Sequence, residues 1–211
     1  MKMQRRLALF GGVVLFCAFS GCASQRRVVV GLSADLEGYY AIYPSIEFDA
    51  AAVTAEEADQ IKKDGVDKYF APGSPLRKRL EPFTVYFSQE QTAPETLYFR
   101  SEYWDKWLKK KPVTLILIAN LPHVPDMPDE DPRILSVDLR KNSVFTQPVY
   151  VEIEPDKIAR IFDLPRDPRT GLKAEVRRPD NRETAGKNHV NPYAPADEPE
   201  QGGDTPSVDT P

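Results

Sequence analysis

Carboxylates gather in one short stretch of this chain, Leu121–Arg133, whose sequence is LPHVPDMPDEDPR. Four of them lie within six positions: Asp126, Asp129, Glu130 and Asp131. Oxygen ligands at this density could hold Ca²⁺. The Asp-x-Asp-x-Asp-Gly spacing of a calcium loop is absent, so the pattern favours a solvated acidic loop, and we predict no metal site.

The same stretch has the character of a partner-binding loop. It follows the most apolar segment of the chain and contains prolines that stiffen it in an extended form: Pro122, Pro125, Pro128 and Pro132. A stiff, exposed loop at the end of a sheet is a suitable place to meet another protein. We therefore predict that His123, Asp126, Asp129, Glu130 and Asp131 form a contact with a protein partner.

Hydrolytic chemistry has little support in the sequence. The only histidines are His123 and His189, so a Ser-His-Asp triad would need one of them as its base. No Gly-x-Ser-x-Gly elbow precedes a helix, and Gly73-Ser74 lies in a proline-rich turn. We expect a protein that is not an enzyme, with a hydrolase acting through His123 as the least favoured alternative.

The first residues form an export signal. Lys2, Arg5 and Arg6 give a positive start, Leu7–Phe19 carries no charge, and Ser20-Gly21 supplies small residues for a peptidase. A permanent membrane span needs about 20 apolar residues, so this run is short for that role.

The residues Phe19-Ser20-Gly21-Cys22 resemble the lipobox of bacterial lipoproteins, with Phe19 in place of the usual Leu. The resemblance implies cleavage before Cys22 by signal peptidase II, a diacylglycerol on its thiol and an N-acyl chain, and no other cofactor. Ala23 in the next position implies sorting to the outer membrane, facing the periplasm. An ordinary secretory signal and an uncleaved anchor are the alternatives.

The mature chain would differ from the precursor in thiols and charge. Loss of residues 1–21 removes Cys17, so Cys22 has no partner for a disulfide. It also removes Lys2, Arg5 and Arg6, which takes the formal net charge from −4 to −7. Nucleic acid is therefore not an expected partner, because binding it needs a basic surface.

Strand patterns dominate the region that must position the loop. Apolar and polar residues alternate, or β-branched residues cluster, in six segments: Tyr43–Val53, Phe83–Phe87, Leu97–Arg100, Val113–Ala119, Ile134–Leu139 and Val149–Ile153. The run VTLILIA at 113–119 is the predicted central strand. We expect a mainly β protein with two helical insertions (α+β), built as a β-sandwich.

Two helices are expected between the strands. Thr54-x-x-Glu57 matches a capping box that opens the first helix, and the turn at Pro72–Pro75 ends it. Ser101–Lys110 is the second, with Trp104 and Trp107 on one face. Their spacing favours a buried face, although exposed aromatics would instead suit a cell-wall glycan or other saccharide.

These patterns divide the chain into four parts. Residues 1–21 are the signal peptide, 22–27 the lipidated cysteine and a short tether, and 28–165 the globular domain. Residues 166–211 contain seven prolines and few large apolar residues, so we predict a disordered C-terminal tail.

In overall plan, residues 22–164 resemble the TssJ lipoproteins of type VI secretion systems. The lipobox, the strand-rich pattern and the acidic loop between late strands carry this resemblance; the helix from Ala55, the tryptophan pair and the tail depart from it. It implies a transthyretin-like sandwich and a loop that binds an inner-membrane protein. We expect a non-enzymatic docking subunit of an envelope complex, such as a secretion system, anchored to the membrane by lipid. A glycan-binding lipoprotein that contacts peptidoglycan is the alternative.

Overall fold

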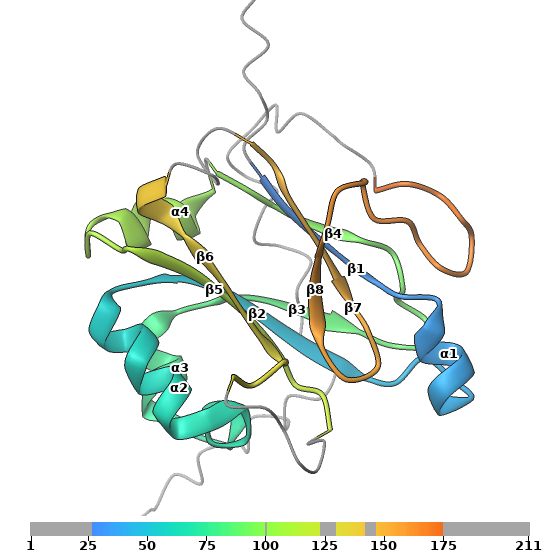
Figure 1. Ribbon diagram of the computed structural model, residues 1–211, viewed down its shortest axis with the longest axis horizontal. Coiled ribbons are helices and arrows are strands. Elements are labelled where there is room, and N and C mark those ends of the chain that lie inside the picture. Colours follow the sequence, from blue (N-terminus) through green and yellow to red (C-terminus); the bar gives the residue numbers. More distant parts are fainter. Residues whose placement is uncertain (1–26, 100, 123–129, 142–146, 175–211) are drawn as a thin grey trace, which may run out of the picture.

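Two four-stranded β-sheets pack face to face in the computed structural model, which describes residues 27–99, 101–122, 130–141 and 147–174 (Figure 1). Short helices flank the sheets. This arrangement confirms the predicted mainly β sandwich. The predicted lipobox, most of the acidic loop and residues 175–211 of the predicted tail lie outside the described residues.

Sheet A has the order β4 (Glu95–Tyr98), β1 (Arg27–Leu32), β7 (Val149–Ile153) and β8 (Ile158–Ile161). β1 runs antiparallel to β4 and parallel to β7, and β7 is antiparallel to β8. The strands β1 and β8 were not predicted, because their sequences, RVVVGL and IARI, do not alternate apolar and polar residues.

Sheet B is antiparallel throughout, in the order β3 (Phe83–Phe87), β2 (Ile46–Val53), β5 (Thr114–Ala119) and β6 (Ile134–Asp138). β5 lies inside this sheet, between β2 and β6, and its last five residues are all buried. Because both of its faces are covered, the strand reads as a continuous apolar run, and the prediction of a central strand is confirmed.

The hydrophobic core lies between the two sheets. On β1 the alternate residues Val28, Val30 and Leu32 belong to it, and they are joined by side chains of the facing sheet such as Phe48 and Leu117. Each fully buried side chain of this size stabilises the fold by about 1.5–3 kcal/mol. No disulfide is needed to explain a stable domain of this size.

The described part of the chain also contains four helices: α1 (Asp35–Tyr40), α2 (Ala55–Phe70), α3 (Pro75–Leu80) and α4 (Glu102–Leu108), together with the 3₁₀ turn η1 (Leu139–Lys141). α2 and α4 were predicted. α1 and α3 were not, because six residues are too few for helical periodicity to appear. Pro75 closes the predicted turn and also occupies the first turn of α3, where its missing amide hydrogen costs nothing.

The predicted capping box of α2 is present. The Thr54 hydroxyl accepts a hydrogen bond from the Glu57 amide at 3.3 Å, and the Glu57 carboxylate accepts one from the Thr54 amide at 3.0 Å. Gly65 interrupts the helix, with φ at 76°, a left-handed value that glycine adopts without strain. This interruption was not predicted from the sequence.

A buried carboxylate attaches α2 and α3 to the outer face of sheet B. Asp49 on β2 accepts hydrogen bonds from Arg77 Nε of α3 at 2.7 Å, from Thr84 of β3 at 2.6 Å and from Tyr69 of α2 at 2.9 Å. Three elements therefore converge on one side chain. Burial raises the pKa of the Asp49 carboxyl, and the hydrogen bonds from Arg77, Thr84 and Tyr69 act in the opposite direction.

The segment after β8 covers the outer face of sheet A. Pro165 comes so near to β1 that a Cβ atom built on Gly31 would lie 2.7 Å from its own Cβ. Asp167 accepts a hydrogen bond from Thr92 at 2.7 Å, and the Ala174 amide donates to the Pro165 carbonyl oxygen at 3.1 Å. The described domain therefore reaches nine residues beyond its predicted end at 165.

Candidate functional site

The predicted partner-binding loop joins β5 to β6, and the structure describes its two ends. His123, Asp126 and Asp129 lie outside the described residues. Glu130 is exposed, whereas Asp131 is partly buried. The described part of the site is its base, where Leu121 follows β5 and Arg133 precedes β6.

Arg133 organises this base. Its side chain is only 2% exposed, which is rare for arginine unless its donors are paired. Nε and Nη2 of Arg133 donate to the two carboxylate oxygens of Asp131 at 3.0 and 2.9 Å. The Arg133 amide also donates to Asp131 at 3.0 Å. A two-pronged pair of this kind fixes the guanidinium in one orientation.

The third nitrogen of Arg133 connects the loop to the rest of the domain. Nη1 donates to the Leu121 carbonyl oxygen at 3.0 Å and to the Asp67 carboxylate of α2 at 2.7 Å. Burial lowers the pKa of Arg133, but its hydrogen bonds and charge interactions with Asp131 and Asp67 raise the pKa by more than burial lowers it. The net shift is upward, so Arg133 stays positively charged. The two ends of the loop are thus held together by one buried charge.

Asp131 therefore stabilises the loop base through its pair with Arg133. Both of its oxygens accept hydrogen bonds from Arg133, so its charge is already matched. Of the two loop carboxylates that the structure describes, Glu130 is the one exposed to solvent. Sequence reasoning missed Arg133; its only local signal is the Asp-x-Arg spacing, which recurs at Asp138 and Arg140 on the surface.

The loop base adjoins the end of sheet A at which β8 starts. The Ile158 amide donates to the Pro132 carbonyl oxygen at 2.9 Å. Ile158 pairs with Ile153, which pairs with Leu32, so these residues share one end of sheet A, which we call the Ile158 end. The loop is therefore held at this end of the sandwich.

The opposite end of sheet A is where β1 starts. Arg27 pairs with Tyr98, Val28 with Val149, and Tyr150 with Ile161, so we call this the Arg27 end. Five residue steps of about 3.4 Å separate Arg27 from Leu32, or ~17 Å along β1. In Figure 1, β1 starts near the top of the domain, whereas the end of β5 and the start of β6 lie toward the bottom.

The other polar cluster of the domain is closed to substrates. Asp49, with hydrogen bonds from Arg77, Thr84 and Tyr69, is 1% exposed.

Trp104 and Trp107 are each 1% exposed and pack edge to face with ring centroids 5.3 Å apart. The preferred interpretation of the tryptophan pair as core is confirmed, and these rings offer no face on which a sugar could stack.

Among the described residues, no three His, Cys, Asp or Glu side chains are grouped so that they could hold a metal ion. Over the same part of the chain, no helix is both long and apolar enough to cross a bilayer.

The solved structures that resemble this chain include three components of type VI secretion systems. Lip of Serratia marcescens, described as a membrane-bound component of that system, is 5% identical, covers 65% of this chain and 96% of its own, and gives a TM-score of 0.43. A chain of a type VI membrane complex is 8% identical, with 64% and 96% covered and a TM-score of 0.44. The lipoprotein TssJ1 of Pseudomonas aeruginosa is 13% identical, with 67% and 99% covered and a TM-score of 0.35.

No protein-family model and no curated protein sequence match the chain. The sequence predicts a resemblance in overall plan to TssJ, and TssJ1 is among the solved structures that are similar to this chain. At TM-scores of 0.35 to 0.44 it is a likeness of plan and assigns no residue and no partner to this chain.

Proposed function

We propose that this protein is a lipid-anchored, non-enzymatic docking subunit of an envelope complex, and that the loop Leu121–Arg133 binds its protein partner. Residues Cys22 and Ala23 imply an outer-membrane anchor with the domain facing the periplasm. A secretion system is the class of assembly implied by the lipobox together with the strand plan.

This proposal is supported by the position of the loop base relative to Arg27, the first described residue after the predicted anchor. The tether enters the domain at Arg27, whereas Pro132 at the loop base bonds to Ile158 at the opposite end of sheet A. A domain held by its Arg27 end therefore directs the loop away from the membrane. That is the direction in which a protein partner in the periplasm approaches.

The buried Arg133 fixes the two described ends of the loop relative to each other. A partner pays less ordering entropy when it binds a segment whose ends are already fixed. Because Asp131 is matched by Arg133, the proposed contact relies on His123, Asp126, Asp129 and Glu130. Carboxylates in these positions favour a basic surface on the partner, through complementary charge.

The glycan-binding alternative loses its main support in the structure. It required aromatic faces open to a sugar, and Trp104 and Trp107 are instead packed in the core. No described site favours it over a protein partner.

The anchor is tested with Cys22→Ser. Wild-type protein should incorporate labelled palmitate and fractionate with outer membranes, whereas the variant should do neither. Incorporation of palmitate by the variant would show that the acyl chains are attached elsewhere.

The docking loop is tested by crosslinking in cells. A photoreactive amino acid is placed at Glu130, and at the exposed Glu90 in the β3–β4 connection as a matched control site. We expect one envelope protein to be captured in fixed proportion from position 130 and not from position 90. Capture of no protein from 130, or of the same mixture from both sites, would contradict the proposal.

The charge of the contact is tested separately. The triple change Asp126→Asn, Asp129→Asn and Glu130→Gln should reduce the captured protein severalfold without changing the amount of lipoprotein in the membrane. Unchanged capture would show that the loop carboxylates do not contribute.

A further inference from the structure

Phe162 is the most exposed large hydrophobic side chain among the residues that the structure describes. It is 97% exposed and follows directly after Ile161, the last residue of β8. Neither the core nor the segment that covers sheet A packs against it. Its ring is therefore open to contact by another surface.

The strand register places Phe162 at the Arg27 end of sheet A. Tyr150 of β7 pairs with Ile161, and Val149 of β7 pairs with Val28 of β1. Phe162 therefore lies level with Val28, two strands away. Two interstrand spacings of about 4.8 Å put its Cα roughly 10 Å from the start of β1.

The proposed lipid anchor lies close to the same end. Only residues 23–26 separate Cys22 from Arg27. At about 3.5 Å per residue the fully extended tether spans no more than ~18 Å. A domain on so short a tether must bring the Arg27 end near the lipid headgroups.

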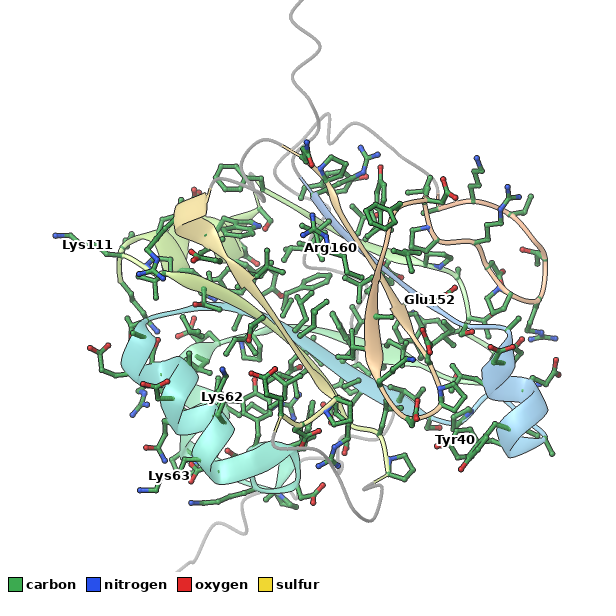
Figure 2. The ribbon with its side chains drawn as sticks, in the orientation of Figure 1. Tyr40, Lys62, Lys63, Lys111, Glu152 and Arg160 are labelled. Carbon is green, nitrogen blue, oxygen red and sulfur yellow. The ribbon has the colours of Figure 1, made fainter. Side chains whose placement is uncertain are left out.

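The charges at this end suit an anionic lipid surface. Arg160, on β8 two residues before Phe162, is exposed, and Figure 2 labels it on the upper half of the domain, toward the start of β1. Arg27 begins β1, with its guanidinium 3.3 Å from the Tyr150 hydroxyl, and Arg26 precedes it in the sequence. Basic residues beside a bilayer attract acidic headgroups, and aromatic rings concentrate at the interface.

We infer that the Arg27 end of sheet A rests on the bilayer, with Phe162 in the boundary between headgroups and acyl chains and Arg160 among the headgroups. This inference rests on the proposed lipid anchor at Cys22. The contact adds a second, non-covalent attachment point about 10 Å from the tether, which fixes the tilt of the domain. The loop Leu121–Arg133 is thereby aimed away from the membrane instead of swinging freely.

The test uses the cysteine content of the chain. In the acylated protein Cys17 has been removed and the Cys22 thiol is occupied, so an introduced cysteine is the only free thiol. Phe162→Cys is labelled with a nitroxide, and Tyr39→Cys, at another exposed aromatic, serves as the matched control. Tyr39 is 72% exposed on α1, which follows the opposite end of β1.

Both labelled lipoproteins are reconstituted in vesicles of phosphatidylethanolamine and phosphatidylglycerol. Spin relaxation is then measured with oxygen, which concentrates in lipid, and with a water-soluble nickel chelate. We expect the ratio of oxygen to nickel accessibility to be severalfold higher at position 162 than at position 39. Equal ratios, or protection of position 162 from both reagents because protein covers it, would overturn the membrane contact.

Unmodified wild-type protein distinguishes the two proposals. It should take up no nitroxide, because its Cys22 thiol is acylated. Labelling of the wild type would refute the anchor and with it this inference. An unlabelled wild type with equal ratios at 162 and 39 would refute the contact and leave the anchor intact.

Discussion

Arg133 donates a hydrogen bond of 3.0 Å from its guanidinium to the main-chain carbonyl oxygen of Leu121, twelve positions earlier in the chain. The two ends of the proposed docking loop are therefore joined by a side chain that is almost wholly buried. Leu121 and Arg133, at the loop base, are both buried, so loss of this hydrogen bond should affect the stability of the domain.

Arg133→Met should destabilise the domain and weaken partner capture. The change leaves the Leu121 carbonyl oxygen and the Asp131 carboxylate without their donor, at a cost of about 1–3 kcal/mol in the free energy of unfolding. Urea denaturation of the purified protein measures it. Arg140→Met is the matched control, because Arg140 makes the same Asp-x-Arg pair with Asp138 but is 72% exposed. If the two variants lose equal stability, the buried clamp has no special role.

Gly31→Ala should destabilise sheet A. The new Cβ would lie 2.7 Å from the Pro165 Cβ, so β1 or the covering segment must move, which costs about 1–3 kcal/mol. Gly38→Ala provides the comparison, since a Cβ there meets nothing within 4 Å and alanine suits the helix α1 better. Thermal melting should show a lower midpoint for the first variant only. A neutral Gly31→Ala would mean that Pro165 does not pack on β1.

Glu152→Gln tests the electrostatics of the outer face of sheet A, where Figure 2 labels Glu152. Burial, followed by the charges of Glu154 and Asp35, raises the pKa of Glu152 above its ordinary 4.5. The folded state therefore holds this proton more tightly than the unfolded state, and Glu152 costs stability as the pH rises through that raised pKa.

The glutamine variant should gain stability relative to the wild type between about pH 4 and about pH 7, because it cannot ionise. Urea denaturation at both pH values measures the gain. Glu90→Gln, at an exposed position of the β3–β4 connection, controls for the substitution itself. A wild-type advantage that grows with pH would contradict the direction of the pKa shift.

Truncation tests where the domain ends. A chain that stops after Ala174 should keep its melting temperature, because the segment that covers sheet A is intact. A chain that stops after Pro165 should melt several degrees lower, since it loses the bond from Thr92 to Asp167 and the bond from Ala174 to Pro165. Equal melting temperatures for the two truncated chains would show that residues 166–174 contribute little to stability. A lower melting temperature for the chain ending at Ala174 than for the full-length protein would show that residues 175–211 dock on the domain.

Local features of the fold could be predicted from the sequence. The capping box of α2 depends on two residues three positions apart, and the continuous apolar run of β5 reflects burial of both faces of one strand. The alternation of β3 and β7 likewise shows which side chains face the core. Each pattern is visible because its cause acts within a few residues.

Contacts between residues far apart in the chain could not be predicted in this way. Gly31 and Pro165 meet across 134 positions of the chain, and Arg77 reaches Asp49 across 28, distances over which no periodic pattern extends. In the sequence, Phe162 and Arg160 belong to a short, mostly apolar segment with no evident role, and the pairing of β8 with β7 brings them to the Arg27 end. The loop and the tether occupy opposite ends of one sheet because strand pairing fixes direction as well as contact, and pairing partners are chosen by the packing of the whole core.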